Sequence, residues 1–180
     1  MEQCKKCGYI YSDAIIKTAS DYARYYPNQG KFVYNYCNNC NFITIYKANF
    51  FGKLKPKKII TLGELLFTDE FQKRDPKGGF YSQHMLRLIW DCLVIQQGTN
   101  GTGMDITFNA FKLALKKFPA REVGFFLMML QHYFQLGGIR YYGIYMDNSN
   151  IENWLNECSS DEKIPLVREI YRNHLKSMGK

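Results

Sequence analysis

The chain has 180 residues, of which 46% are hydrophobic and 22% are charged, and its net charge is +8. The hydrophobic content excludes a disordered protein, and the longest apolar run, residues 123–130, is far shorter than the ~20 residues of a membrane span. We therefore expect no membrane partner, and one core of about 100–150 residues beside a small module that needs a metal to fold.

Two identical cysteine motifs lie near the N-terminus, Cys4-Lys5-Lys6-Cys7 and Cys37-Asn38-Asn39-Cys40. Each motif lets two thiolates on one tight turn hold a single ion, and two motifs complete the four-sulfur shell of structural zinc sites. The sequence therefore predicts one structural Zn²⁺ bound by Cys4, Cys7, Cys37 and Cys40. Because all four positions of the metal are filled by protein, a catalytic role for the zinc is not expected.

The alternative interpretation of the four cysteines is a pair of disulfides. The first residues show no apolar core behind a basic start, so we expect no signal peptide and a cytoplasmic or nuclear location, where disulfides are rare. Cys92 and Cys158 fall in helical patterns and are predicted to be unpaired thiols.

The gap between the two motifs is longer than usual for a zinc ribbon, so we expect an inserted helix around residues 15–25, capped by Ser12 or Asp13. Gly8 directly follows the first motif and fits a turn that needs positive φ. Residues 32–36 and 42–46 are rich in β-branched and aromatic side chains and are predicted to form a β-hairpin that carries the second motif at its tip.

Residues 53–60 include Lys-Pro-Lys-Lys and are predicted to be a basic linker. Thr61-Leu62-Gly63-Glu64 is a capping box, which predicts a helix to about residue 73. Further helices are expected in the ranges 82–97, 105–117, 119–136, 149–157 and 164–178, and residues 139–146 are ambiguous and read as a possible strand. The fourth of the helices after the linker is apolar nearly all round, so we expect it at the centre of the bundle.

These elements predict an α+β fold. Residues 1–52 are predicted to form an N-terminal zinc ribbon with four cysteine ligands, that is, a β-hairpin with two knuckles. Residues 61–180 are predicted to form a predominantly α-helical domain of five or six helices.

The positive charge lies mostly in the N-terminal third. Residues 1–60 hold ten basic and three acidic residues, a net charge of +7, whereas residues 61–180 hold fourteen basic and thirteen acidic residues, a net charge of +1. A basic surface attracts polyanions. The lysines predicted to bind nucleic acid or a partner are Lys5, Lys6, Lys31, Lys47, Lys53, Lys55, Lys57 and Lys58.

Aromatic residues alternate with these lysines, and rings on a two-stranded sheet can stack bases. Tyr34 and Tyr36 are the predicted binding rings. The alternative is that the rings form the core of a small ribbon. The aromatic set comprises Tyr9, Tyr11, Tyr22, Tyr25, Tyr26, Phe32, Tyr34, Tyr36, Phe42, Tyr46, Phe50 and Phe51.

Arg168 and His174 lie six residues apart in the last predicted helix. The pair resembles the arginine–histidine motif of HEPN-type ribonucleases, helical bundles in which two subunits assemble one site. The resemblance covers that helix alone and implies a helical ribonuclease as a minor alternative function. Six residues correspond to about 240° around a helix, so the two side chains do not share a face.

The sequence as a whole favours a non-enzymatic, zinc-binding factor that binds DNA or RNA, or a nucleic-acid-handling complex, while the helical domain supplies a second contact or a homodimer surface. Residues with AT-rich codons are abundant, which favours a phage or viral regulator or an inhibitor of a host nuclease or polymerase complex. A protein-interaction adaptor or inhibitor without nucleic-acid affinity is the alternative.

Overall fold

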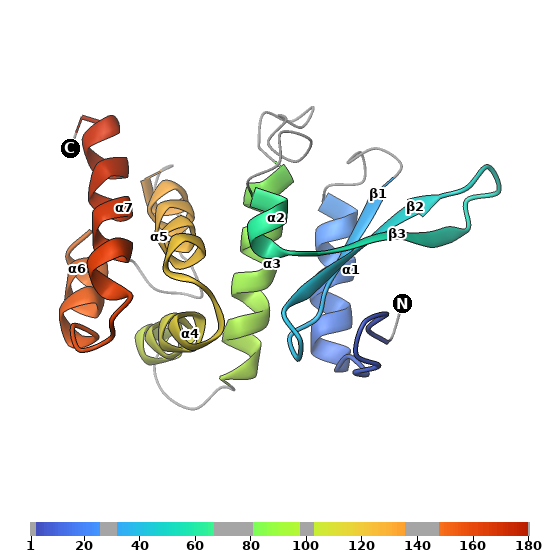
Figure 1. Cartoon of the computed structure of the whole chain (residues 1–180), viewed down its shortest axis with the longest axis horizontal. Coiled ribbons are helices and arrows are strands. Elements are labelled where there is room, and N and C mark those ends of the chain that lie inside the picture. Colours follow the sequence, from blue (N-terminus) through green and yellow to red (C-terminus); the bar gives the residue numbers. More distant parts are fainter. Residues whose placement is uncertain (1–2, 26–31, 67–80, 98–102, 136–147, 180) are drawn as a thin grey trace. The chain divides into compact units, whose positions relative to one another are not determined.

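The computed structural model describes residues 3–25, 32–66, 81–97, 103–135 and 148–179 (Figure 1). The chain forms two compact units, Met1–Ile95 and Gln96–Lys180. The first unit contains a three-stranded antiparallel sheet with helices, and the described part of the second is helical. The predicted α+β class is therefore confirmed.

The sheet of the first unit has the strand order β1-β2-β3, with β1 at Phe32–Tyr36, β2 at Phe42–Ala48 and β3 at Leu54–Thr61. β1 and β2 pair antiparallel from Phe32↔Lys47 to Tyr36↔Ile43. This is the predicted hairpin, and the second cysteine motif occupies its turn. The core of the unit begins beside this turn, where Ile43 and Tyr36 are almost fully buried.

Strand β3 replaces most of the predicted linker at residues 53–60. Pro56 misled the sequence interpretation, because proline usually ends a strand pattern. β3 is an edge strand, and its register against β2 shifts at a bulge between Ile45 and Tyr46, so that Tyr46 faces Pro56. Proline is tolerated at such places because an edge strand leaves every second N–H unpaired and a bulge interrupts the ladder.

Helix α1 spans Asp13–Tyr25 and fills the gap between the two cysteine motifs, as predicted. The backbone N–H of Ile15 donates to the Ser12 hydroxyl at 3.4 Å, which identifies Ser12 as the capping residue.

Helix α2, at Leu62–Leu66, opens with the predicted capping box. The N–H of Thr61 donates to Glu64 Oε2 at 2.7 Å, and the N–H of Glu64 donates to Thr61 Oγ1 at 3.2 Å. The predicted continuation to residue 73 lies outside the described residues.

Helix α3, at Tyr81–Gln96, begins and ends one residue before the predicted range. Ile89, Trp90 and Leu93 on this helix are fully buried, and Cys92 is 1% exposed. The spacing of these apolar residues therefore does reflect a core-facing helix, and Cys92 packs as a small apolar side chain.

The described part of the second unit consists of α4 at Gly103–Lys117, α5 at Ala120–Gln135, α6 at Asn148–Glu157 and α7 at Ile164–Ser177. All four helices were predicted, with bounds that differ by up to two residues. The ambiguous segment at residues 139–146 lies outside the described residues.

The described side chains of helix α5 are mostly buried, as its apolar sequence predicts. Val123, Phe126, Leu127 and Leu130 have no exposed surface. α5 packs closely on α7 at Gly124, where an added Cβ would lie 2.8 Å from the Cγ2 atom of Ile170.

A lysine also joins elements of this unit. Lys163 lies just before α7, and its ammonium group donates to the carbonyl oxygens of Leu115 and Phe118 at the end of α4. A cation at this end of a helix satisfies free carbonyl groups and opposes the negative end of the helix dipole. Among the described residues, no helix has the length and hydropathy that would let it cross a bilayer.

Candidate metal centre

The first cysteine motif sits in a tight turn closed by the backbone. The N–H of Cys4 donates to the carbonyl of Tyr9 at 2.8 Å, and the N–H of Gly8 donates to the carbonyl of Cys4 at 3.0 Å. Gln3 and Ile10 bridge just outside this turn. Gly8 has φ of +75°, which confirms the sequence expectation, since glycine adopts this conformation without steric cost.

The second motif repeats the same turn. The N–H of Cys37 donates to the carbonyl of Phe42 at 2.9 Å, and the N–H of Asn41 donates to the carbonyl of Cys37 at 2.8 Å. Asn41 occupies the position that Gly8 has in the first turn and also has a positive φ, of 60°. Asparagine is among the few other residues that adopt this conformation readily. Two equivalent turns thus present two pairs of thiols.

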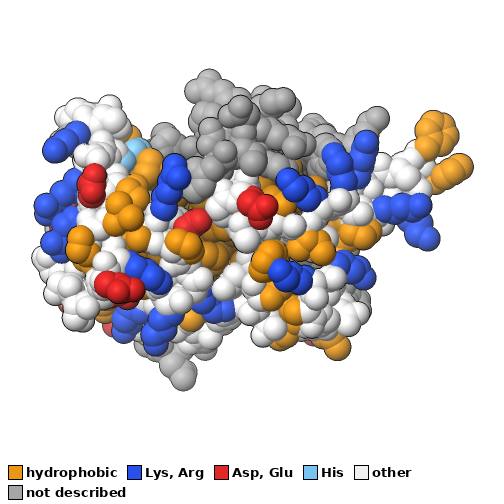
Figure 2. Space-filling model, viewed as in Figure 1, with side chains coloured by type: hydrophobic (Ala, Val, Ile, Leu, Met, Phe, Trp, Pro, Cys, Tyr) orange, Lys and Arg blue, Asp and Glu red, His pale blue; other side chains and the backbone are white. Residues whose placement is uncertain are grey.

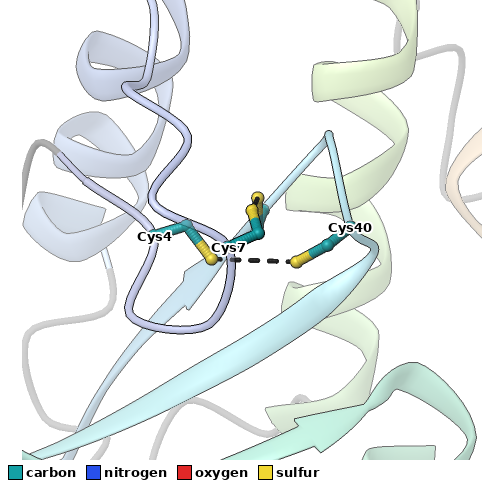
Figure 3. Close-up of side chains that lie close together, drawn as sticks. Cys4, Cys7 and Cys40 are labelled. Carbon is teal, nitrogen blue, oxygen red and sulfur yellow. Dashed lines mark hydrogen bonds between the residues drawn. The ribbon is translucent and has the colours of Figure 1, made fainter.

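The four predicted ligands come together. The sulfur atoms of Cys4, Cys7, Cys37 and Cys40 all lie within 4.8 Å of one another. Figure 3 shows the side chains of Cys4, Cys7 and Cys40 converging, the first two from the N-terminal turn and the third from the turn between β1 and β2. The Cys4–Cys40 and Cys7–Cys37 sulfur distances are both 3.7 Å.

These distances fit a single zinc ion. A tetrahedral shell with Zn–S bonds of about 2.3 Å requires sulfur–sulfur distances of about 3.8 Å. A disulfide bond is only about 2.05 Å long, and all four cysteines are free thiols in this structure. The geometry therefore supports the metal interpretation over the pair of disulfides.

Hydrogen-bond donors surround the sulfur atoms. The N–H of Lys6 lies 3.4 Å from the sulfur of Cys4, and the side-chain amide of Asn39 lies 3.6 Å from the sulfur of Cys7. The Asn39 contact crosses from the second turn to the first. Donors of this kind stabilise thiolates and orient them toward a metal.

The thiols differ in their environment. The backbone N–H of Tyr9 and the amide of Asn39 lower the pKa of the exposed Cys7 to about 6. Burial raises the pKa of Cys37 to about 12 and also raises the pKa of Cys40. Because Zn²⁺ binds thiolates, metal uptake by this site requires the buried thiols to lose their protons.

Most of the rings near the site belong to the core. Tyr11, Tyr36 and Tyr46 are at most 5% exposed, and burial raises the pKa of each. The hydroxyl of Tyr36 donates to the side-chain oxygen of Asn41 at 3.0 Å. Tyr36 was predicted to stack on a partner, and its burial contradicts that role. Tyr34 is half-buried.

The predicted binding lysines fall into two groups. Lys5 and Lys6 are exposed on the first turn, and the ammonium group of Lys6 lies 3.0 Å from the centre of the Phe42 ring. The second group lies on the β2–β3 hairpin, and we call residues 45–58 the basic arm. Its exposed lysines are Lys47, Lys53, Lys55, Lys57 and Lys58. Lys31 lies outside the described residues.

Two members of the aromatic set that were not among the predicted binding rings are conspicuous in the structure. Phe50 and Phe51, at the apex of the basic arm, are 98% and 89% exposed. Figure 2 shows hydrophobic side chains projecting at this apex beside Lys or Arg side chains. In the sequence, Phe-Phe-Gly lies between two strands, which would place the two rings in a hairpin turn. Because β3 was not predicted, this turn was not recognised.

Arg168 contacts helix α6. Its Nη2 atom donates to Asn156 Oδ1 at 2.9 Å, and its Nε atom lies 4.0 Å from Glu152 Oε2. Arg168 and His174 are both half-buried. These contacts give Arg168 a role in joining α6 to α7.

Comparisons of this chain with protein-family models, with curated proteins and with solved structures found no match.

Proposed function

We propose that residues 1–52 form a zinc ribbon with α1 inserted between its two knuckles, and that the protein is a non-enzymatic factor that binds nucleic acid, or a nucleic-acid-handling complex, through the basic arm. The zinc is structural, because four cysteine sulfurs leave no coordination position open for a substrate or water. Its role is to hold the N-terminal turn against the β1–β2 hairpin.

The row of lysines on the basic arm carries this proposal. In the β2–β3 register, Lys47 faces Lys55 and Ile45 faces Lys58, so the three lysines share one face of the arm. Near the base of the hairpin the same face carries Ile43 and Ile60, which are buried. The face that forms core at one end of the hairpin is therefore positively charged at the other.

This arrangement is costly for the isolated protein. Like charges directly opposite on neighbouring strands destabilise a sheet, and Lys47 and Lys55 are such a pair. No aspartate or glutamate occurs anywhere between Asp21 and Glu64 to offset them. A bound polyanion would remove the repulsion and release counterions.

Protection of an exposed sheet edge is a competing explanation for these lysines, because lysine and proline on an edge strand prevent pairing with other chains. It accounts for Lys55, Lys57 and Lys58 on β3. It does not account for Lys47, which lies on the central strand, or for Lys53, which lies in the turn. The positive charge therefore extends beyond the edge strand β3, and edge protection does not explain all of it.

Lys5 and Lys6 have a different role in this proposal. Four thiolates around one Zn²⁺ leave roughly two negative charges, and the two lysines on the first turn offset them. Lys6 is also held over the Phe42 ring. We therefore assign the polyanion contact chiefly to the arm.

The test is fluorescence anisotropy of short labelled DNA and RNA, single-stranded and duplex, with the zinc-loaded protein at increasing salt. Binding is expected at ~50 mM salt and should weaken steeply as salt rises, because each lysine–phosphate contact adds about −0.7 to −0.9 to the slope of log K against log salt. Neutralising Lys53, Lys55 and Lys58 to glutamine should flatten this slope by about 2–3.

The matched control neutralises three exposed lysines outside the arm, Lys17, Lys116 and Lys176, and should leave the slope nearly unchanged. If the wild-type protein binds none of these oligonucleotides at ~50 mM salt, the proposal of direct nucleic-acid binding is wrong. A protein complex that survives nuclease treatment in an affinity purification would then favour the adaptor, whose lysines meet an acidic protein surface.

A further inference from the structure

The apex of the basic arm presents two rings to solvent. Phe50 and Phe51 are 98% and 89% exposed, and their ring centroids lie 5.6 Å apart at an interplanar angle of 89°. Burying a phenylalanine ring is favourable relative to exposing it to water, and hairpin turns are ordinarily built from small polar residues. Two adjacent exposed rings at this place therefore need an explanation outside the isolated fold.

A defined turn holds these rings outward. The side-chain oxygen of Asn49 accepts the N–H of Phe51 at 3.1 Å and the N–H of Lys53 at 2.8 Å. The N–H of Gly52 donates to the Asn49 carbonyl at 3.0 Å, and Gly52 has φ of +75°. A turn with this many internal hydrogen bonds pre-organises the rings, so little ordering entropy is lost when they engage a partner.

We infer that Phe50 and Phe51 stack on unpaired bases while the arm lysines hold the phosphates of the same strand, so that the arm binds single-stranded nucleic acid. This inference rests on the proposed function and names the form of nucleic acid that it takes. A positively charged groove or strand that follows the backbone, together with exposed rings, is the usual means of binding single strands.

The charge of the arm argues for an anionic partner. Lys53 directly follows the apex turn and Lys47 precedes it by two residues, and the row continues along one face to Lys55 and Lys58. The charges thus follow the length of the arm from the rings toward its base. A single strand fits this linear arrangement, since its bases reach the apex and its phosphates pass along the lysines.

Two other anionic partners fit the apex less well. An anionic bilayer offers negative charge and an apolar interior. Because lysine and asparagine lie close to the rings in the sequence, only the two phenylalanine side chains would enter the bilayer, and so shallow an insertion anchors a protein weakly. A duplex would have to be unstacked before a ring could enter, which costs free energy at every base step that is opened. Unpaired bases stack without that cost.

The experiment compares apex variants of the full, zinc-loaded chain in oligonucleotide binding. F50A/F51A should weaken binding to a single strand about ten-fold or more, because base–ring stacking contributes about 1–3 kcal/mol per base. The salt slope should remain that of the wild type, since no charge is removed. F50W/F51W should retain binding, and the emission of the new tryptophans should be quenched by the oligonucleotide.

F50L/F51L is the discriminating control, because leucine keeps apolar surface but has no ring. It should bind as weakly as F50A/F51A, and full binding by the leucine variant would overturn stacking. Both side chains are nearly fully exposed, so these substitutions should leave zinc content unchanged by native mass spectrometry.

Further outcomes separate this inference from the proposed function. If the wild type binds oligonucleotides and F50A/F51A binds equally well, the inference fails and the proposed function stands. Tighter binding to duplex than to single strand would also overturn the inference. Phenylalanine-dependent sedimentation with phosphatidylserine vesicles, with no phenylalanine dependence for oligonucleotides, would assign the apex to membranes instead. If no oligonucleotide binds at all, this inference and direct nucleic-acid binding both fail.

Discussion

The four cysteines of the cluster are not equivalent, and Cys7 is the one that tests the metal site most directly. Its side chain is exposed, so replacing it disturbs little packing, whereas Cys4 and Cys37 are buried. Cys158 is half-exposed, lies outside the cluster and offers a matched thiol.

We predict that Cys7→Ser lowers zinc content and zinc affinity, measured by native mass spectrometry and chelator competition. Removal of a hydrogen bond to a metal ligand lowers metal affinity roughly 10–100-fold, and Asn39→Ala measures that effect here. The loss of zinc affinity in Cys7→Ser should be larger. Cys158→Ser should retain one zinc per chain. Full zinc occupancy in Cys7→Ser would contradict a site with four sulfur ligands.

Glu64 in the capping box of α2 provides a pH-dependent test. The backbone N–H and hydroxyl of Thr61 hold the pKa of Glu64 below its ordinary 4.5, with smaller contributions from Lys58 and Lys6. A carboxyl group whose pKa is lowered by folding stabilises the fold above the unfolded pKa. That contribution is lost as the pH falls through the folded pKa.

We predict that Glu64→Ala lowers the free energy of unfolding at pH 7 by about 0.5–1 kcal/mol, as expected for a lost cap. The difference from the wild type should shrink below pH 4.5, because protonation in the folded protein removes the charge-dependent part of these hydrogen bonds and leaves a neutral cap. Urea denaturation at a series of pH values measures it. Glu64→Gln keeps the capping geometry and should lose only the pH dependence.

At the scale of elements, the contact between α5 and α7 depends on the missing side chain of Gly124. A glycine inside a helix lowers helix stability by up to about 1 kcal/mol relative to alanine. The structure gives its reason, because a Cβ there would lie 2.8 Å from Ile170 Cγ2. Helix propensity and packing therefore act in opposite directions at this position.

We predict that Gly124→Ala destabilises the protein by about 1 kcal/mol or more, because overpacking typically costs 1–3 kcal/mol and exceeds the gain in helix propensity. In an Ile170→Ala background the contacts with Cγ2 and Cδ1 are gone and only the contact with the Cβ of residue 170, at 3.0 Å, remains, so the same substitution should cost clearly less. A double-mutant cycle by chemical denaturation measures this difference. Stabilisation by Gly124→Ala in both backgrounds would show that the helices separate freely.

The elements also show what the sequence predicts well. β1 and β2 were predicted because they lie beside the core and carry β-branched and aromatic side chains, and helices α3 to α7 because their apolar residues repeat at helical spacing. β3 was missed because most of its residues are exposed, so its lysines and Pro56 follow no core pattern. A strand that is held by its neighbour and not by the core leaves little periodic signal.

The candidate site divides in the same way. Cys4, Cys7, Cys37 and Cys40 were predicted because two identical motifs and the geometry of one ion leave few arrangements. Alternation along β1 suggests two faces but not which of them meets the core, so Tyr36 was assigned to a partner although it is buried. The exposure of Phe50 and Phe51 follows from a hairpin whose second strand was not expected.

At the scale of the whole molecule, the metal cluster belongs to the first compact unit and helices α4 to α7 belong to the second. Zinc removal is therefore predicted to loosen the two units unequally. Structural zinc contributes roughly 10–16 kcal/mol of apparent binding free energy in small modules, so its loss should open the turns that it joins.

Hydrogen exchange before and after chelation measures this difference. Residues 3–10 and the β1–β2 hairpin should exchange much faster without zinc, whereas the buried faces of α5 and α7 should keep their protection. Cys7→Ser should reproduce the effect without a chelator. Equal loss of protection in both units would show that the chain unfolds as a single cooperative body.

The equivalent turns at Cys4–Cys7 and Cys37–Cys40 have a consequence for the segment that joins them. One ion cross-links positions about 30 residues apart, and in the chain-entropy treatment a link of that span removes roughly 3–4 kcal/mol of freedom from the unfolded state. That benefit varies only with the logarithm of the span, by about 0.6 kcal/mol for each doubling. Added residues in the stretch containing α1 therefore cost little chain entropy, which makes this stretch the natural place to insert a reporter peptide.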